Sequence, residues 1–270
     1  MEYMELNQKL DPRILDKLNL GIEVVKNAAL LLKDMGDLQI ENKNDDFQDL
    51  VTNFDVLIEK KIIFDILKKY PNDGWISEEN SIAYNRNNNV WILDPIDGTT
   101  NFSVSNDNFA ISLAYYENMK SLFGIVYDVI NDELYIGVKG YGSYLNYKKI
   151  SVVTNEELHQ NIVYTSVKSL LQFNKKYDLD IEKFANKVLA TRSLGSVALE
   201  VCKVANGKAG MAISGHIKIW DIAAAKVILE EAGGYIKYFS DDVYSMKNTF
   251  MVSGNCNRIV KRFLKLLNKS

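Results

Sequence analysis

The first third of the chain contains two stretches in which apolar residues recur at helical spacing. The first follows Asp11-Pro12, a typical helix start because Asp can cap free amide groups and Pro fits the first turn. It predicts a helix ending at Gly36, with a stripe formed by Ile14, Leu18, Ile22, Val25, Ala29 and Leu32. A second predicted helix ends near Tyr70-Pro71 and carries the stripe Phe54, Ile58, Ile62 and Ile66. Between the two, residues 40–48 are polar and without a period, which favours an exposed loop.

Short apolar runs bounded by turn residues predict strands in the rest of the chain. Residues 75–77 and 90–93 have the composition of buried strands, and the second should stop at Asp94 because Pro95 cannot donate to a sheet ladder. β-Branched and aromatic runs predict an antiparallel meander over 108–146. One helix is then expected within 169–189, further helices over 194–207, 222–234 and 255–267, and strands over 209–213, 235–239 and 249–252.

Length and composition fit a globular chain with one large core or two lobes that share an interface. The chain has 270 residues, of which 47% are hydrophobic and 25% charged. We expect a single domain over 1–270, with an N-terminal lobe of about 1–150 and a C-terminal lobe of about 151–270. The net charge of −3 gives no general attraction to nucleic acid or to an anionic membrane.

Several classes of protein are disfavoured by residues that the chain lacks. Cys202 and Cys256 lie far apart, which argues against a disulfide framework or a zinc knuckle and favours a reducing, cytoplasmic setting. The start of the chain does not have the basic and apolar regions of a signal peptide, and no uncharged apolar run approaches membrane-spanning length. With two histidines and no Gly-x-Ser-x-Gly motif, a Ser-His-Asp hydrolase is improbable. Carboxylates must therefore carry any chemistry.

The segment 91–102 delivers two carboxylates into a turn at the end of a predicted strand. Asp94 and Asp97 are three residues apart, so both side chains can converge on one point, as a hard divalent cation requires. The carbonyl of Ile96 is a third candidate oxygen, and the amide groups of Gly98-Thr99 could face an anion. The alternative is a plain strand followed by a turn, since Asp-Pro and Asp-Gly are common turn dipeptides. The second hydroxyl that follows Thr99 favours the ligand site.

The other candidate residues each have a structural alternative. Glu78-Glu79 follow the strand at 75–77 and could stand beside Asp94, or form a solvated loop. Asp55 lies in the first turn of a predicted helix, where the helix dipole stabilises a carboxylate. Asp221 could cap the helix after it, and Ser196 could cap the helix at 194–207. Taken singly, capping accounts for these residues as well as binding does.

Together these segments resemble the inositol monophosphatase family. The resemblance is carried by Asp-Pro-Ile-Asp-Gly-Thr-Thr-Asn-Phe at 94–102, by Ser77-Glu78-Glu79, and by Trp220-Asp221 with its small-residue helix. The order and separation of the three blocks fit, and the likeness spans nearly the whole chain. It implies an α+β fold, the layered α/β/α/β/α sandwich of the inositol monophosphatase and fructose-1,6-bisphosphatase type, and a homodimer.

The resemblance also implies an activity and its residues. The chain would be a magnesium-dependent, lithium-sensitive phosphate monoester hydrolase in which a metal-activated water attacks phosphorus in line, with roughly two or three Mg²⁺ ions per site. The implied metal ligands are Glu78, Asp94, the carbonyl of Ile96, Asp97, Asp221 and Glu79. The implied catalytic residues are Glu78, Thr99 and Asp55. The implied substrate contacts are Ile96, Asp97, Gly98, Thr99, Gly195, Ser196, Val197, Ser214 and Asp221.

The expected substrate is a small phosphorylated metabolite, and Ser214 bears on which one. Counting back from Asp221, Ser214 aligns with a Glu that contacts inositol hydroxyls in many members of the family, so inositol itself is disfavoured. Phosphatases of NADP, 3′-phosphoadenosine 5′-phosphate or fructose bisphosphate are alternatives. A protein that only binds a phosphorylated ligand is an alternative of another class, and the retention of every metal-binding acid argues against it.

Overall fold

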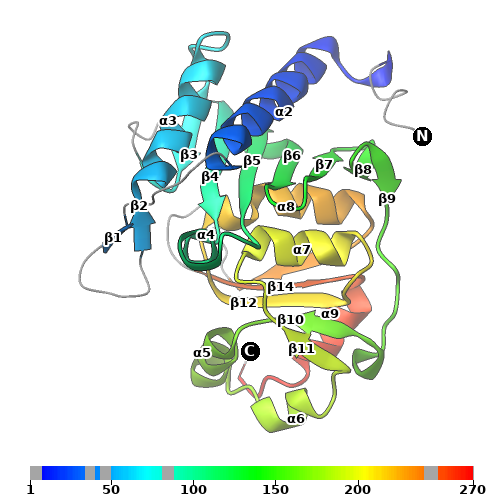
Figure 1. Ribbon diagram of the computed structural model, residues 1–270. Helices are drawn as coiled ribbons and strands as arrows, with labels where there is room; N and C mark the ends of the chain where they lie inside the picture. Colours follow the sequence, from blue (N-terminus) through cyan, green and yellow to red (C-terminus); the bar gives the residue numbers. More distant parts are fainter. Residues whose placement is uncertain (1–7, 34–39, 43–49, 81–87, 240–248, 270) are drawn as a thin grey trace.

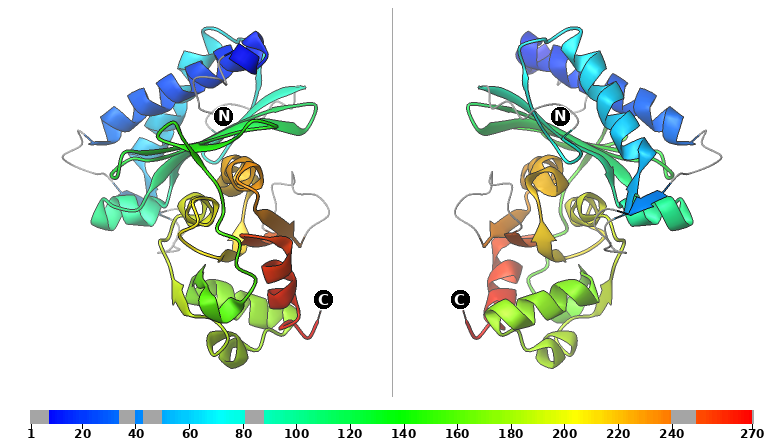
Figure 2. Two further views of the ribbon diagram at one scale, coloured as in Figure 1. Left: turned by 90° about the vertical axis from the view of Figure 1, so that its right-hand side faces the viewer. Right: turned by 90° about the vertical axis from the view of Figure 1, so that its left-hand side faces the viewer.

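The chain is folded into five stacked layers of helices and sheets. The computed structural model describes residues 8–33, 40–42, 50–80, 88–239 and 249–269. Figure 2 shows the layers edge-on: helices, a seven-stranded sheet, helices, a five-stranded sheet and an outer group of helices follow one another. The α/β/α/β/α sandwich expected from the sequence is therefore confirmed.

The first layer consists of helices α2 (Pro12–Lys33) and α3 (Asn53–Leu67), which cover one face of the seven-stranded sheet (Figure 1). Asp11 caps α2, since its carboxylate accepts the Arg13 amide at 2.8 Å. The helix ends at Lys33, and its predicted end at Gly36 lies outside the described residues.

The loop expected over 40–48 was wrong in its first part. Strand β1 (Ile40–Asn42) pairs antiparallel with β2 (Leu50–Thr52), while 43–49 lie outside the described residues. A two-stranded hairpin is held by backbone hydrogen bonds and needs no apolar period, so the sequence pattern carried no sign of it.

The seven-stranded sheet has its strands in chain order. Strand β3 is parallel to β4, and each later pair is antiparallel, which confirms the meander predicted over 108–146. The strands are β3 (Gly74–Ser77), β4 (Asn89–Asp97), β5 (Ala110–Glu117), β6 (Lys120–Asp128), β7 (Glu133–Val138), β8 (Gly142–Leu145) and β9 (Lys148–Ile150). A short helix, α4 (Thr99–Ser105), lies between β4 and β5.

The predicted end of β4 at Asp94 was wrong, because the strand continues through Pro95 to Asp97. Asp94 lies opposite Ser112 of β5 and Asp97 opposite Ala110, so β4 contains one extra residue there. Such a bulge leaves one residue unpaired and tolerates a proline that cannot donate. It also has a consequence for side chains. Residues three apart in a regular strand point to opposite faces, and the extra residue brings Asp97 to the face of Asp94.

The middle layer contains α7 (Val197–Ala205) and α8 (Ile219–Glu231), which pack between the two sheets (Figures 1 and 2). Two sheet glycines allow α8 to approach closely. A Cβ on Gly124 of β6 would lie 2.3 Å from the Ala224 carbonyl oxygen, and one on Gly137 of β7 would lie 2.6 Å from Ile228 Cα. Only glycine fits at these two contacts between backbones.

The five-stranded sheet and the outer helices complete the fold. The sheet has the order β11-β10-β12-β14-β13, with β10 (Ile162–Tyr164), β11 (Ala190–Arg192), β12 (Met211–Ile217), β13 (Tyr235–Tyr238) and β14 (Thr249–Gly254). Outside it lie α5 (Val167–Tyr177), α6 (Ile181–Ala185), α9 (Asn257–Leu264) and the 3₁₀ turn η1 (Leu158–Gln160). The single helix expected within 169–189 is thus two helices, because Asp178 adopts a left-handed conformation that ends α5.

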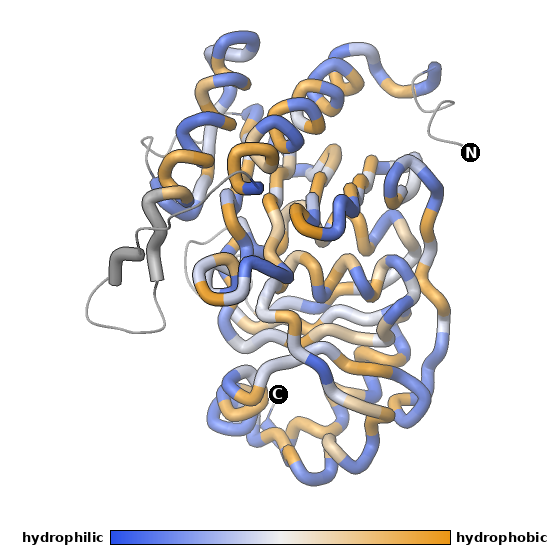
Figure 3. The backbone as a smooth tube through the Cα atoms, in the orientation of Figure 1, coloured by the Kyte–Doolittle hydropathy of each residue, from blue (hydrophilic) through white to orange (hydrophobic). Residues whose placement is uncertain are grey.

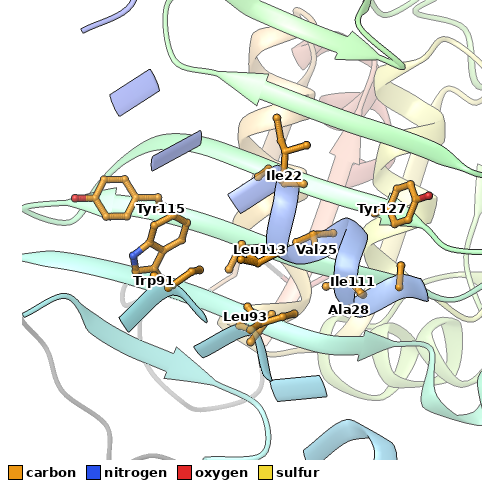
Figure 4. Close-up of a cluster of buried hydrophobic side chains, with 14 of the residues drawn as sticks. Ile22, Val25, Ala28, Trp91, Leu93, Ile111, Leu113, Tyr115 and Tyr127 are labelled. Atoms are coloured by element: carbon orange, nitrogen blue, oxygen red, sulfur yellow. The ribbon is translucent and has the colours of Figure 1, made fainter. Parts of the chain in front are cut away.

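Three hydrophobic clusters hold the layers together, and orange, apolar segments follow the strands and α7 and α8 in Figure 3. Strand β4 belongs to two of them. Trp91 and Leu93 belong to the cluster with α2 and α3, and Figure 4 shows them beside side chains of α2, whereas Val90 and Ile92 belong to the cluster with α7 and α8. In the described ranges, no helix combines the length and apolar character that crossing a membrane requires.

A buried ion pair fastens α2 to the seven-stranded sheet. Lys17 is 2% exposed and its ammonium group is bonded to the carboxylate of Asp73, which also accepts the Trp91 indole N–H at 2.8 Å. The same ammonium group lies 3.8 Å from the centre of the Tyr70 ring and 4.5 Å from that of Tyr115. The charge is thus surrounded by aromatic faces and one carboxylate.

Candidate active site

Two predicted acids lie at the bulged end of β4. Asp94 is buried, with 2% exposure, and one carboxylate oxygen accepts the Ile96 amide at 3.1 Å. Asp97 is 7% exposed. The bulge places both side chains on the sheet face toward α7 and α8, so the two carboxylates come together within β4, whereas the sequence prediction had them meet in a turn beyond the strand end.

Asp97 is held by the N-terminus of α7. Its carboxylate accepts the Ser196 hydroxyl, the Val197 amide at 3.3 Å and the Ala198 amide at 2.7 Å. Burial raises the pKa of Asp97 to about 6, against these three hydrogen bonds, which lower it. Ser196 also caps α7 through the Leu199 amide, so the predicted cap is present, while its predicted contact with the substrate stays a prediction.

A second acid pair follows β3, the parallel neighbour of β4. Glu78 and Glu79 stand directly after Ser77, and the Glu78 amide donates to the Leu93 carbonyl oxygen at 3.3 Å. The Glu79 amide donates to the carboxylate of Glu59 on α3 at 3.0 Å. Neighbouring strands therefore end at one edge and bring these acids beside those of β4, as expected.

Asp221 and Asp55 reach the same region from two helices. Asp221 lies in the first turn of α8 and is not its cap, because the helix already begins at Ile219; its carboxylate accepts the Lys218 amide at 2.8 Å. Burial, followed by the charge of Asp97, raises the pKa of Asp221 to about 7. Asp55 lies in the first turn of α3 and is 1% exposed.

These acids act on one another electrostatically. Burial raises the pKa of Glu78 well above its ordinary value, and the charges of Asp221, Glu79, Asp55 and Asp97 raise it further. Burial likewise raises the pKa of Asp94, followed by the charges of Glu78, Asp97, Asp221 and Asp55. The site therefore concentrates negative charge contributed by α3, β3, β4 and α8.

A divalent cation fits this donor set chemically. Every side chain in it offers carboxylate oxygen, the donor that Mg²⁺ prefers, and a bound cation would offset the mutual repulsion. Within the part of the chain that the structure describes, no three His, Cys, Asp or Glu side chains already form a metal-binding cluster. The assignment of individual ligands thus stays a prediction from the sequence.

Thr99 joins two elements of the site. Its hydroxyl lies 3.0 Å from the Ile96 carbonyl oxygen and 3.4 Å from a carboxylate oxygen of Asp55. A hydroxyl has one proton, so the shorter contact to Ile96 is the better hydrogen bond and Asp55 is the alternative acceptor. The Asp55–Thr99 pair expected from the sequence is therefore in contact.

The remaining residues predicted to contact the substrate are Gly98, Gly195, Val197 and Ser214, and not all of them contact the acids. A Cβ built on Gly98 would lie 3.4 Å from Ser196 Cβ and 3.5 Å from the Gly195 carbonyl oxygen, so these two loops touch. Val197 donates to Asp97. Ser214 is buried in β12 opposite Met251, and in the described residues no recorded contact joins it to the acids.

Two residues that the sequence reading did not select also belong to this region. Asn101 donates through its amide nitrogen to the carbonyl oxygens of Asn108 at 2.9 Å and Leu194 at 2.5 Å. Glu200 accepts the amides of Leu194 at 2.8 Å and Gly195 at 3.4 Å. Asn101 stands inside the run at 94–102, which could have drawn attention to it, whereas Glu200 looks like any acid on an amphipathic helix.

Solved structures define the class of fold. An inositol monophosphatase structure from Thermotoga maritima has a TM-score of 0.80 and 28% identity, covering 94% of this chain and 97% of that one. An IMPase/NADP phosphatase complexed with Mg²⁺ and phosphate has a TM-score of 0.80 and 26% identity, with 96% of each chain covered. A lithium-soaked inhibitory complex of a staphylococcal inositol monophosphatase-1 has a TM-score of 0.81 and 26% identity, again with 96% of each covered.

Sequence comparison then gives the family. The inositol monophosphatase family profile matches residues 16–268. The fructose-1,6-bisphosphatase/inositol-1-monophosphatase of Thermotoga maritima is 33% identical over 228 residues, which are 84% of this chain and 86% of that protein. The inositol-1-monophosphatase of Bacillus subtilis is 34% identical over 222 residues, 81% of this chain and 83% of that one. The chain therefore belongs to the inositol monophosphatase family and is a phosphoric monoester hydrolase of that type.

Proposed function

We propose that this phosphatase depends on magnesium and hydrolyses a small phosphorylated metabolite at the acidic site between β4, α7 and α8. The observation that carries the proposal is the gathering of acids at one place in the fold: Asp94 and Asp97 are buried at the bulged end of β4, beside Glu78 after β3 and Asp221 in the first turn of α8. In keeping with this, burial raises the pKa of all four, and neighbouring acids raise those of Glu78, Asp94 and Asp221 further. A related structure that contains Mg²⁺ and phosphate supports it.

The proposed ligands follow the sequence prediction. Glu78, Asp94 and the Ile96 carbonyl would hold one ion, and Asp94, Asp97 and Asp221 a second, so Asp94 would serve both. Glu79 and Asp55 would surround a third. When bound, Mg²⁺ would supply positive charge that neutralises phosphoryl oxygens, lowers the pKa of the attacking water and stabilises the leaving alkoxide.

The chain's own groups would orient the reactants. The Asp55 carboxylate and the Thr99 hydroxyl oxygen, 3.4 Å apart, would both accept hydrogen bonds from the attacking water and so aim its lone pair at phosphorus, while the Thr99 proton stays on the Ile96 carbonyl oxygen. The amides of Gly98 and Thr99 would face the phosphate. Gly195, Ser196 and Val197, on the segment that touches Gly98, would border the alcohol part of the substrate.

A phosphatase of this family can act on phosphate esters of different alcohols, so the alcohol part of the substrate is a separate question. Relatives include a fructose-1,6-bisphosphatase/inositol-1-monophosphatase and an IMPase/NADP phosphatase, so sugar phosphates and nucleotide 2′-phosphates stand beside inositol phosphates as candidates. Ser214 offers one short hydroxyl where a carboxylate would pair with two neighbouring ring hydroxyls. We therefore propose a weak preference for inositol 1-phosphate.

The test is the release of inorganic phosphate from a panel of monoesters by purified protein, with Mg²⁺ and with chelator. The panel contains inositol 1-phosphate, fructose 1,6-bisphosphate, NADP and 3′-phosphoadenosine 5′-phosphate. We expect turnover only with Mg²⁺ and inhibition by lithium, as in the staphylococcal complex. Tight binding of phosphate without turnover of any monoester would instead support a protein that only binds a phosphorylated ligand.

We also propose that the protein is a cytoplasmic homodimer, as the family resemblance implied. Light scattering of the purified chain, with a calculated mass of 30.7 kDa per protomer, measures the assembly directly. A mass of one protomer at micromolar concentration would reject the dimer.

A further inference from the structure

The backbone N–H and C=O groups of Leu194 are both held by side chains, and these come from residues far apart in the chain. Its amide donates to the Glu200 carboxylate at 2.8 Å, and its carbonyl oxygen accepts from the Asn101 side chain at 2.5 Å. Gly195, the next residue, donates to the same Glu200 oxygen at 3.4 Å. Both hydrogen-bonding groups of one peptide residue are therefore fixed by side chains, one from α4 and one from α7.

Asn101 connects three segments with one amide group. Its two N–H groups point to the carbonyl oxygens of Leu194 and Asn108, so it ties α4 to the turn before β5 and to the loop before α7. The first of these contacts spans 93 positions of sequence. It joins α4, which follows Asp97 at the end of β4, to the loop that supplies Ser196.

Glu200 is an unusual acid for a helix packed between two sheets. It is 5% exposed, and a buried carboxylate is costly unless hydrogen bonds satisfy it. Burial raises its pKa to about 7, partly offset by the amides of Leu194 and Gly195 and by a side-chain hydrogen bond from Ser193. In the described residues, the recorded hydrogen bonds of its carboxylate all come from the segment 193–195, so holding that segment is the role that its position allows.

The two segments meet at two glycines that both have a positive φ. Gly195 has a φ of +80°, and a Cβ there would lie 2.9 Å from the Asn101 amide nitrogen. Gly98 has a φ of +98°, and its Cβ would lie 3.5 Å from the Gly195 carbonyl oxygen. Hydrogen bonds therefore set the spacing: those of Asp97 to the start of α7, and that of Asn101 to the Leu194 carbonyl, on a segment that Glu200 holds from the other side.

We propose that Asn101 and Glu200 are positioning residues that clamp Leu194-Gly195 from opposite sides and thereby set the Ser196 hydroxyl and the α7 amides against Asp97. The clamp itself follows from the contacts; its effect on catalysis rests on the proposed function. The competing explanation is that each side chain supports its own loop independently. The two explanations differ in whether the effects of the two residues are coupled. In a clamp, removing either side chain frees the Leu194-Gly195 segment, whereas with independent supports each substitution affects only its own loop.

The direct test is hydrogen exchange of the Leu194 and Gly195 amides in the full chain without substrate. Asn101→Ala removes a bond to the carbonyl of Leu194 and none to these amides, yet the clamp predicts that it speeds their exchange by at least about tenfold, as Glu200→Ala does. Glu200→Gln is the matched control, because its amide oxygen can occupy the accepting position and keep both bonds. Unchanged exchange in Asn101→Ala overturns the proposal.

Kinetics give the second arm. We expect Asn101→Ala and Glu200→Ala each to lower kcat by about thirtyfold, the double variant to lose no more than about threefold beyond either, and Glu200→Gln to stay within about threefold of wild type. Losses that multiply in the double variant overturn the clamp. If Asn101→Ala fails to fold, near-isosteric Asn101→Asp, which cannot donate to the two carbonyls, replaces it and must show the same rise in exchange. If Glu200→Ala fails to fold, the exchange of the Asn101 variant alone decides the proposal.

The two arms separate this proposal from the proposed function. A wild type without phosphatase activity would reject the function, while the exchange data would still decide the clamp. A wild type with activity, combined with unchanged exchange in the variants, would reject the clamp alone.

Discussion

In the folded protein without a bound cation, the negative charge of Asp94 is destabilising. Asp94 is 2% exposed, and the acids that act on it most strongly are Glu78, Asp97 and Asp221. Natural sites often keep such residues at a cost in stability because the chemistry requires them. Function and stability at this residue should therefore change in opposite directions.

Replacing Asp94 by Asn tests this opposition. We expect phosphatase activity to fall by more than about a thousandfold, roughly 4 kcal/mol, because the proposed bridging ligand is lost. In chelator, the same variant should melt a few degrees above wild type, since about 1 kcal/mol shifts Tm by roughly 2–4 °C in a chain of this size. Calorimetry and a phosphate-release assay measure both. Activity within about tenfold of wild type would contradict the bridging role.

Ser214→Glu tests substrate choice at a single position. A Glu there could accept two ring hydroxyls, so kcat/KM for inositol 1-phosphate should rise relative to NADP or fructose 1,6-bisphosphate by at least about tenfold. Thr191→Glu on exposed β11 is the control for added charge in the same sheet. A wild type that already prefers inositol 1-phosphate by about a hundredfold, roughly 2.7 kcal/mol, would reject the role given to Ser214.

At the scale of elements, apolar periodicity predicted the helices and strands that pack against a hydrophobic core. It did not predict the elements that depend on backbone hydrogen bonds or on a local irregularity of the strand. The stripes of α2 and α3 and the meander were readable because their apolar side chains join one buried cluster, part of which Figure 4 shows. The β1–β2 hairpin has no such stripe. The extension of β4 past Pro95 depends on a bulge, which is defined by pairing with β5 and not by any residue of β4 alone.

The attachment of α2 to the sheet gives a prediction at this scale. Lys17→Met leaves the buried Asp73 carboxylate with the Trp91 indole but without its cation, so we expect a loss of about 3–5 kcal/mol in the free energy of unfolding. Adding Asp73→Asn should restore much of it. Lys69→Met is the control, because its ion pair with Asp16 is solvent-exposed and worth about 1 kcal/mol or less. Urea unfolding measures all four proteins, and equal losses for Lys17 and Lys69 would contradict the interpretation.

At the scale of the whole molecule, the site exists only in the assembled fold. Asp55, Glu78, Asp94 and Asp221 come from α3, β3, β4 and α8, and their convergence was expected from family resemblance, since spacing alone left each of them open to a capping or loop role. Glu200 could not have been selected, because its burial depends on the packing of α7 between two sheets. Sequence pattern thus predicted the acids that resemble a known motif better than the residues that support them.

The buried acids of the site make the free energy of unfolding depend on pH and on bound metal. Folding raises the pKa of Asp97 from 3.8 to about 6 and that of Asp221 from 3.8 to about 7, so the folded state binds more protons than the unfolded state between these values. In chelator, the contribution of these groups to stability should therefore fall as pH rises from about 4 to about 7. Saturating Mg²⁺ should cancel most of the fall, because binding to the folded state alone adds stability.

Urea unfolding at several pH values above 4.5, with chelator and with Mg²⁺, measures this difference. The paired acids Asp16, Asp65 and Glu117 have lowered pKa values and lose their contribution only at lower pH, so they do not interfere in this range. Identical pH slopes with and without Mg²⁺ would show that no cation binds among the raised acids.

Gly124 and Gly137 extend the demands of the site to positions that carry no chemistry. Each sits where the sheet touches the backbone of α8, the helix whose first turn presents Asp221 toward the acids of β4. A single methyl group at either position would push α8 outward and separate Asp221 from Asp94, although no acid in the sequence has been replaced. Among related chains, we expect Gly124 and Gly137 to be conserved as strictly as the carboxylates, whereas the sequence of the outer helices can vary.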